Sequence, residues 1–166
     1  MTSLTLRPPR IGDLGWVVHR QALLYAEEYG FDARFEGLLA EIVGRFVREF
    51  DAKSERCWIA AQDGAVAGSV FLCRADETTA KLRLLYVEPS ARGAGVGRRL
   101  VDACVSTARE LGYRTLTLWT NDIHLPARAL YARAGFACIE RENLTMFGRE
   151  MVGETWALEL GARPGG

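Results

Sequence analysis

The stretch that decides the fold is LRLLYVEPSARGAGVGRRL, residues 82–100. It opens with the apolar residues of a β-strand, and Pro89 ends that strand because proline has no amide hydrogen for strand pairing. Glycines follow, and a helix with a buried stripe begins at Val96. Glycines let a ligand approach the backbone closely, and the first amides of a helix have no partner within the helix. A strand, a glycine-rich turn and a helix in this order favour phosphate binding.

The glycine-rich turn has the pattern R-x-x-G-x-G, formed by Arg92, Gly95 and Gly97. The pattern differs from the G-x-x-x-x-G-K-[ST] loop of nucleotide triphosphatases and from the G-x-G-x-x-G spacing of dinucleotide sites. The residues alone leave two interpretations open. The turn is either a glycine-tolerant connection before a helix or a phosphate cradle, to which Arg92, Arg98 and Arg99 add cationic donors.

The flanking sequence predicts one α/β domain over residues 1–166, with a disordered tail at 162–166. Apolar periodicity predicts helices at about 13–29, from the Asp32 cap to about Phe50, from 96 to the glycine at 112, and at about 126–134. Strands are expected at 4–7, 56–62, 65–74, 80–87, 115–119, 136–142 and 155–160. Asp63-Gly64 predicts a tight hairpin turn. The order β-α-α-β-β-β-α-β-α-β-β predicts a mixed, mostly antiparallel sheet with helices on both faces.

Strand 80–87 carries apolar residues on both of its faces. Simple alternation places Leu82, Leu84 and Tyr86 on one face, and Arg83, Leu85 and Val87 on the other. A strand that is apolar on both faces is typical of the centre of a sheet covered by helices on both sides.

Composition excludes several classes of protein. The formal net charge is zero, which argues against a bulk nucleic-acid binder, and no segment is apolar for the ~18 residues of a membrane span. The start of the chain does not resemble a signal peptide. The four cysteines are widely spaced beside apolar residues, so we expect core thiols, no metal site and a cytoplasmic protein.

A second stretch, TLWTNDIHLPARALYARAGF at 117–136, supplies a strand, a short helix and a tyrosine ahead of Gly-Phe. With the R-x-x-G-x-G turn, it resembles the GNAT superfamily of acyl-CoA-dependent N-acyltransferases. The resemblance covers nearly the whole chain in element order. The stretches GWVVHR (15–20), LYAEEYG (24–30), KLRLLYVEPSARG (81–93) and LTLWTND (116–122) look closest to a bacterial branch often fused behind a MarR-like DNA-binding domain. We expect no such DNA-binding domain in this chain.

The resemblance implies acetyl-CoA as co-substrate and an acyltransferase fold of GNAT type. The pyrophosphate would lie on the backbone of the glycine turn, and pantetheine would pair with a strand that bulges and splays from its neighbour. Arg92 could alternatively brace the loop. His124 stands where many members carry an asparagine, so it is kept as a cofactor contact. The implied cofactor contacts are Leu85, Tyr86, Val87, Arg92, Gly93, Ala94, Gly95, Val96, Gly97, Arg98, His124 and Ala127.

The resemblance also implies catalytic roles. Tyr131 matches the tyrosine that protonates the departing thiolate, although a core tyrosine is the plain alternative, and Glu28 is the candidate general base, with a solvated helix-end charge as its alternative. Tyr25, Tyr29 and Trp119 are candidate acceptor contacts. The expected reaction is transfer of an acetyl group to a primary amine. A sensing module for acyl-CoA or amines is the competing hypothesis.

The acceptor itself is predicted only loosely. The acidic stretch AEEYGFDARFE, residues 26–36, would suit a cationic amine such as a polyamine, an aminoglycoside, a lysine side chain or a peptide N-terminus. No nucleic acid or membrane partner is expected. A homodimer is a further expectation, because the final strands of such domains often pair across a dimer.

Overall fold

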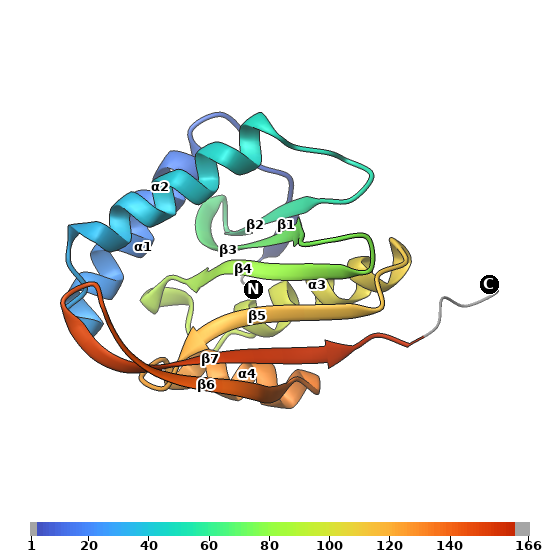
Figure 1. Cartoon of the computed structure of the whole chain (residues 1–166). Coiled ribbons are helices and arrows are strands. Elements are labelled where there is room, and N and C mark those ends of the chain that lie inside the picture. The colour runs from blue at the N-terminus through green and yellow to red at the C-terminus, as the bar shows by residue number, and fades with distance from the viewer. Residues whose placement is uncertain (1–2, 162–166) are drawn as a thin grey trace.

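The structure, a computed structural model, describes residues 3–161 and folds them around a seven-stranded sheet (Figure 1). The strand order is β1-β2-β3-β4-β5-β7-β6, and every neighbouring pair is antiparallel except β4 and β5. The element order and the mixed, mostly antiparallel sheet are therefore as predicted. The strands are β1 (Leu4–Arg7), β2 (Arg56–Gln62), β3 (Ala65–Arg74), β4 (Thr79–Val87), β5 (Thr115–Asn121), β6 (Ala137–Met146) and β7 (Arg149–Glu159).

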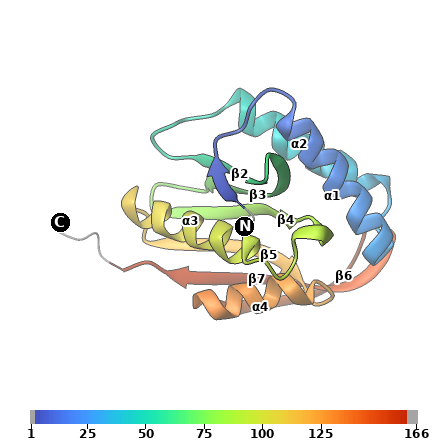
Figure 2. The same cartoon turned by 180° about the vertical axis from the view of Figure 1, so that it is seen from behind.

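Helices cover both faces of the sheet, as expected. Helices α1 (Asp13–Tyr29) and α2 (Ala33–Arg48) lie on one face, and α3 (Val96–Glu110) and α4 (Leu125–Ala134) lie on the other, which faces the viewer in Figure 2. The α3–α4 face forms the larger core, around Leu72, Leu100 and Leu116. The α1–α2 face forms two smaller clusters, around Ile59 and Leu39.

Local signals placed one helix start, one helix end and one turn correctly, although α2 and α3 end two residues before the predicted positions, at Arg48 and Glu110. The Asp32 side chain accepts a hydrogen bond from the amide of Arg34 at 3.0 Å and so caps α2. Asp63 and Gly64 both have positive φ, as the hairpin turn requires. Gly135 ends α4 with φ 100°. The expected tail at 162–166 lies outside the described residues.

Strand β4 is central, but the predicted alternation along it is wrong. Leu84 has a φ of 51°, and the register with β3 shifts between Ser69 and Phe71. This β-bulge adds one residue, so Leu85 follows Leu82 into the core beneath α3, while Leu84 joins Tyr86 on the α1–α2 side. Simple alternation cannot anticipate the change because a bulge moves every later side chain to the opposite face.

Strands β6 and β7 are longer than predicted and form one hairpin. The turn is Phe147-Gly148, with φ values of 55° and 79°. Strand β6 is an edge strand with mostly exposed residues, so the prediction of a core thiol is wrong for Cys138, which is exposed. Cys57 and Cys104 are buried as expected, and Cys73 is half-buried. No helix within residues 3–161 is long and apolar enough to cross a membrane.

Candidate active site

A cavity of about 580 Å³ opens where the glycine turn meets the end of β4. We call it the loop cavity. Its walls come from the turn, from the strand end and from the first residues of α4. The residues that line it are Leu24, Tyr25, Leu85, Tyr86, Val87, Ala91, Arg92, Gly93, Gly95, Val96, Gly97, Arg98, His124, Pro126, Ala127, Leu130 and Arg133. All the predicted cofactor contacts line this cavity except Ala94.

The turn presents free backbone amides. Gly93 and Gly95 have φ values of 83° and 80°, and no atom outside their chain neighbours lies within 4 Å of where a Cβ would stand. Among the described residues, the amides of Gly93, Gly95, Val96, Gly97 and Arg98 have no backbone partner, whereas the amide of Ala94 donates to the carbonyl of Ala91. Unpaired amides at the start of a helix favour an anion, because the helix dipole adds to their attraction.

The strand wall of the loop cavity is a gap in the sheet. Strand β4 pairs with β5 only from Thr79 to Lys81, opposite Thr115 to Thr117. Beyond that point β5 continues to Asn121 along β7, and β4 continues to Val87 along β3. The edge of β4 from the bulge to Val87 therefore faces the gap, as the splay prediction required. An extended ligand can pair with such an edge as an added strand.

Arg92 braces the glycine turn against α1. Its guanidinium donates to the Glu28 carboxylate at 2.5 Å, and their side chains are 47% and 28% exposed. The bracing alternative considered for Arg92 is thus present, while the backbone of Arg92 still lines the loop cavity. Glu28 itself lines neither this cavity nor the next one.

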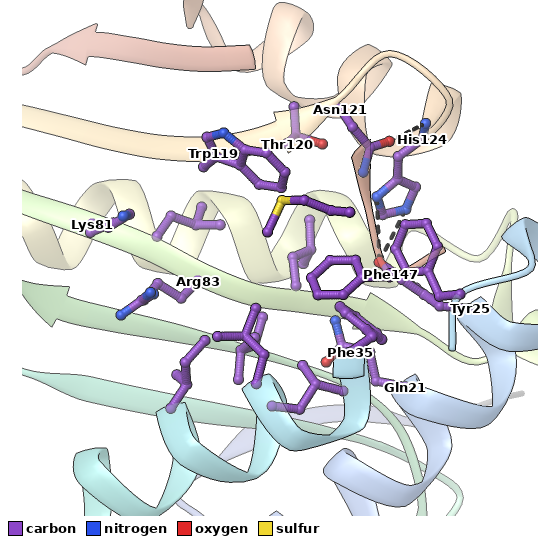
Figure 3. Close-up of a pocket in the computed structure, with 18 of the residues that line it drawn as sticks. Gln21, Tyr25, Phe35, Lys81, Arg83, Trp119, Thr120, Asn121, His124 and Phe147 are labelled. Atoms are coloured by element: carbon purple, nitrogen blue, oxygen red, sulfur yellow. Dashed lines mark hydrogen bonds between the residues drawn. The ribbon is translucent and has the colours of Figure 1, made fainter. Parts of the chain in front are cut away.

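A second cavity, of about 360 Å³, lies on the α1–α2 side of the gap. Aromatic and aliphatic side chains from both halves of the chain form its walls, so we call it the aromatic cavity (Figure 3). The residues that line it are Gln21, Tyr25, Phe31, Phe35, Leu38, Leu39, Ile42, Lys81, Leu82, Arg83, Leu84, Leu85, Trp119, Thr120, Asn121, His124, Tyr131, Leu144, Met146 and Phe147.

The two cavities share one wall, made of Tyr25, Leu85 and His124. The Tyr25 hydroxyl lies 3.3 Å from Nε2 and 3.4 Å from Nδ1 of His124 (Figure 3). Burial lowers the pKa of His124 to about 4, with the charge of Glu28 opposing and that of Arg92 adding to this effect. His124 is therefore a neutral hydrogen-bonding group at neutral pH, and its main-chain amide is held by Asn121 Oδ1 at 3.1 Å.

Tyr131 reaches the aromatic cavity from α4 on the other side of the sheet gap. The residue is 5% exposed, and its ring packs against Phe136 and Trp156. Burial raises the pKa of its phenol far above the ordinary value. Within the part of the chain that the structure describes, no hydrogen bond engages its hydroxyl, so the proton is free for a ligand in the cavity.

The structure separates the other predicted acceptor residues. Trp119 lines the aromatic cavity and is 40% exposed. Tyr29 lines neither cavity; it packs edge-on against Tyr25 and His124, with ring centroids 5.2 and 5.5 Å away. The acidic stretch 26–36 differs from expectation, because Glu28 pairs with Arg92 and Asp32 pairs with Arg34. No acidic residue within 3–161 lines the aromatic cavity.

Sequence reasoning missed most of the aromatic cavity. Gln21, Arg83 and Phe147 come from α1, β4 and the β6–β7 turn, and only the folded chain brings them together. The sequence signal for the last of these is Phe147-Gly148, a two-residue turn that lies between the strands predicted at 136–142 and 155–160. Within residues 3–161, no cluster of histidine, cysteine and acidic residues could hold a metal ion.

A family model for the acetyltransferase (GNAT) family matches residues 24–136. This range includes Tyr25, Leu85 and His124, the residues of the wall that the two cavities share. The chain belongs to this family. It therefore shares the GNAT fold, and the predicted fold class is confirmed. Two solved structures extend the likeness. The chain aligns with a GNAT-family acetyltransferase from Staphylococcus aureus Mu50 with a TM-score of 0.77 and 18% identity over 96% of this chain and 100% of that one.

The second solved structure is yncA from Salmonella typhimurium with its cofactor acetyl-CoA. It aligns with a TM-score of 0.74 and 18% identity, over 99% of this chain and 98% of that one. Among curated proteins, this GNAT chain is 31% identical to the mycothiol acetyltransferase of Mycolicibacterium vanbaalenii over 69% of its own length. It is 36% identical to that of Beutenbergia cavernae over 45% of its length. The chain spans 36% and 25% of those two relatives.

Acetyl-CoA is the co-substrate of GNAT acetyltransferases, and the loop cavity of this family member fits it. The amides of Gly93 and of Gly95 to Arg98, which have no backbone partner among the described residues, suit a pyrophosphate. No described atom beyond the chain neighbours lies within 4 Å of a Cβ at Gly93 or Gly95. The unpaired edge of β4 suits the amides of pantetheine. The thiol end of such a ligand would then meet the wall that the two cavities share.

Proposed function

We propose that this GNAT chain is an N-acetyltransferase that moves an acetyl group from acetyl-CoA to a primary amine. The observation that carries the proposal is the contact between an anion-binding loop cavity and a separate aromatic cavity at Tyr25, Leu85 and His124. The amine nitrogen attacks the thioester carbonyl carbon, an N–C bond forms and the C–S bond breaks. The amine loses one proton, and the departing thiolate gains one.

The cofactor contacts in this proposal are the residues predicted from the sequence. The backbone of Arg92 to Arg98 holds the pyrophosphate, and Leu85, Tyr86 and Val87 bind pantetheine along the gap. His124 and Ala127 lie at the opposite wall, where α4 begins. Ala94 acts only by shaping the turn, because its amide is bonded within the loop and its side chain does not line the cavity.

Tyr131 is the proposed general acid. A phenol with a raised pKa stays protonated at neutral pH, and the Tyr131 hydroxyl has no partner among the described residues that would compete for its proton. Tyr131→Phe should lower kcat by about 10²-fold or more while leaving the KM for acetyl-CoA nearly unchanged. Tyr113→Phe is the matched control, because Tyr113 is also buried and donates only to the Ser54 carbonyl at 2.8 Å. Equal rates in both variants would remove Tyr131 from the mechanism.

Glu28 is the proposed base, acting through water because its carboxylate lines neither cavity. Its ion pair with Arg92 holds it against the glycine turn, and its charge acts on His124 in the wall that the cavities share. Glu28→Gln should lower kcat, whereas Arg92→Gln should mainly raise the KM for acetyl-CoA. If the two variants behave alike, Glu28 only braces the loop.

One assay separates the enzyme from a sensing module. Thiol release from acetyl-CoA is measured with a panel of primary amines, and the thermal midpoint is measured with and without CoA. Acetylation of any amine above the uncatalysed rate supports the enzyme. A CoA-induced rise in thermal midpoint without thiol release for any amine would favour the sensor and overturn the proposal.

Several broader properties belong to the same proposal. We treat residues 1–166 as a single acetyltransferase domain acting in the cytoplasm, consistent with the continuous sheet and the free cysteines. The likeness to domains fused to MarR-like regulators is also kept as a proposal. The last of these properties is the oligomeric state: the proposal is a homodimer that pairs through the exposed edge strand β6. Light scattering of the purified chain, which gives its mass in solution, would test for this dimer. No nucleic acid or membrane partner is proposed.

A further inference from the structure

The charges in the aromatic cavity are all positive at neutral pH. Lys81 and Arg83 lie at one end of the cavity, and Tyr25 and His124 lie at the other (Figure 3). Both cationic side chains are half-buried, and neither forms an ion pair with any residue between 3 and 161. Burial and the neighbouring Arg83 charge lower the pKa of Lys81. Two adjacent cations without a carboxylate partner favour an anionic ligand.

The space between the two ends is apolar. Phe35, Leu84 and Met146 are among the side chains that line it. A ligand that filled it would bury hydrocarbon or aromatic surface there, which is favourable in proportion to the area removed from water. A short, highly charged amine such as a polyamine would gain nothing from these walls and would be repelled by Lys81 and Arg83.

One buried polar atom in the cavity, Gln21 Oε1, has no hydrogen-bond partner among residues 3–161. Gln21 is 3% exposed, and its Oε1 accepts no hydrogen bond within the described part of the chain. Gln21 lines the aromatic cavity close to Phe35 (Figure 3). Leaving a buried acceptor unpaired destabilises a protein, so such an atom in a cavity wall suggests that a ligand supplies the donor. An amine N–H, or a water molecule held by it, would satisfy Gln21.

We propose that the acceptor is an elongated ω-amino acid, with a primary amine, an apolar body and a terminal carboxylate. The amine lies at the wall of Tyr25, His124 and Tyr131, near Gln21, and the carboxylate pairs with Lys81 and Arg83. Strand rise places Lys81 about 12 Å along β4 from Leu85, so the two charged groups must be well separated. This inference rests on the proposed function, because it takes the aromatic cavity as the acceptor site.

The experiment compares four amines as acceptors by thiol release from acetyl-CoA: 8-aminooctanoate, 4-aminobutanoate, octylamine and 1,8-diaminooctane. We expect 8-aminooctanoate to have a kcat/KM at least tenfold above octylamine and further above the diamine. The shorter 4-aminobutanoate should also be poor, since it cannot span the cavity. Octylamine or the diamine matching 8-aminooctanoate would overturn the inference.

Charge reversal locates the carboxylate. Arg83→Glu should lower kcat/KM for 8-aminooctanoate at least tenfold and raise it for 1,8-diaminooctane. Arg48→Glu is the matched control, because Arg48 is an exposed residue of α2 that lines neither cavity. If Arg83→Glu leaves the ratio of kcat/KM for 8-aminooctanoate to kcat/KM for 1,8-diaminooctane unchanged, Arg83 does not bind the acceptor.

Gln21→Leu tests the other end of the cavity. Removing the unpaired oxygen should raise the thermal midpoint of the free protein, and it should raise the KM for every amine without changing their order. A lower thermal midpoint with an unchanged KM would show that Gln21 serves only the fold.

A binding readout distinguishes failure of the inference from failure of the proposed function. In the presence of saturating CoA, 8-aminooctanoate should raise the thermal midpoint of the wild-type chain and not that of Arg83→Glu. If this shift is seen while no amine releases thiol, the acceptor class stands and the catalytic proposal fails. If amines are acetylated with no preference for the carboxylate, the catalytic proposal stands and the acceptor class fails.

Discussion

The burial of His124 predicts a loss of stability as the pH falls from neutral. In the folded chain, burial lowers the pKa of this histidine from 6.5 to about 4, whereas the unfolded chain keeps the ordinary value. Between these two pH values only the unfolded state takes up the proton. The contribution of His124 to the free energy of unfolding is therefore complete above pH 6.5 and is lost as the pH falls toward 4. The whole difference is worth about 3 kcal/mol, of which about 2 kcal/mol is lost by about pH 5.

The measurement is urea unfolding at a series of pH values from 7 down to about 5, for the wild-type chain and for His124→Asn. The wild type should lose about 2 kcal/mol more than the variant over this range. Tyr25→Phe is the second variant, because it removes the hydroxyl next to the ring while keeping the histidine and its buried position. Its pH dependence should follow the wild type, since burial is the larger cause of the lowered pKa.

Parallel pH curves for the wild type and His124→Asn would refute this reasoning. They would mean that His124 accepts a proton as readily in the folded chain as in the unfolded one, and the wall between the two cavities would then be open to solvent. If the pH dependence of stability differs between the wild type and His124→Asn only when CoA is bound, His124 is buried in the CoA complex and not in the free protein.

Three further substitutions test the packing around the site. Gly68→Ala would put a Cβ 2.4 Å from the Tyr86 carbonyl oxygen, so thermal unfolding should show a free energy of unfolding lower by about 1–3 kcal/mol. The KM for acetyl-CoA should also rise, and an unchanged KM would show that the shift at Tyr86 does not reach the loop cavity. Gly37→Ala, in α2 with nothing within 4 Å of its Cβ position, should instead stabilise the chain by about 0.5–1 kcal/mol in the same assay, and a loss would contradict its open surroundings. Glu154 is 1% exposed and binds Arg128, Arg141 and the Trp156 indole, so Glu154→Ala should lower the free energy of unfolding in urea by about 3 kcal/mol. Arg141→Ala, which removes an exposed partner, should lower it by at most about 1 kcal/mol. Equal losses in the two variants would show that the buried carboxylate is not needed.

The sequence was sufficient for those parts of the fold that depend on neighbouring residues. The Asp32 cap, the Asp63-Gly64 turn and the break at Pro89 are local choices of backbone conformation, and the structure has all three. The loop cavity was predictable for the same reason. Its amides belong to one continuous run, from Gly93 to Arg98, so composition and order already determine their geometry.

The aromatic cavity could not be predicted in this way, because tertiary packing creates it. Leu84 turns to the α1–α2 side because it lies in a β-bulge. The residue with positive φ in this bulge is Leu84 itself and not a glycine, so the sequence gives no sign of the bulge. Phe147 reaches the cavity only because β6 and β7 extend into a long hairpin, and the signal for extended strands is weak in an edge strand with exposed residues. Sequence reasoning therefore found most of the residues that line the loop cavity, whereas the acidic side chains of residues 26–36 do not line the aromatic cavity.

The short pairing between β4 and β5 has a consequence for how the free protein moves. Within residues 3–161, β4 and β5 pair at three positions, whereas each pairs along more of its length with its outer neighbour, β3 or β7. The core beneath α3 still joins the two sides of the sheet, so we expect only the backbone to open locally along this seam. Amide hydrogens at the ends of β4 and β5 should then exchange with solvent sooner than those of β3 or β7. A ligand lying in the seam would supply the missing ladder, so protection from exchange on both strand ends would report cofactor binding before any product forms.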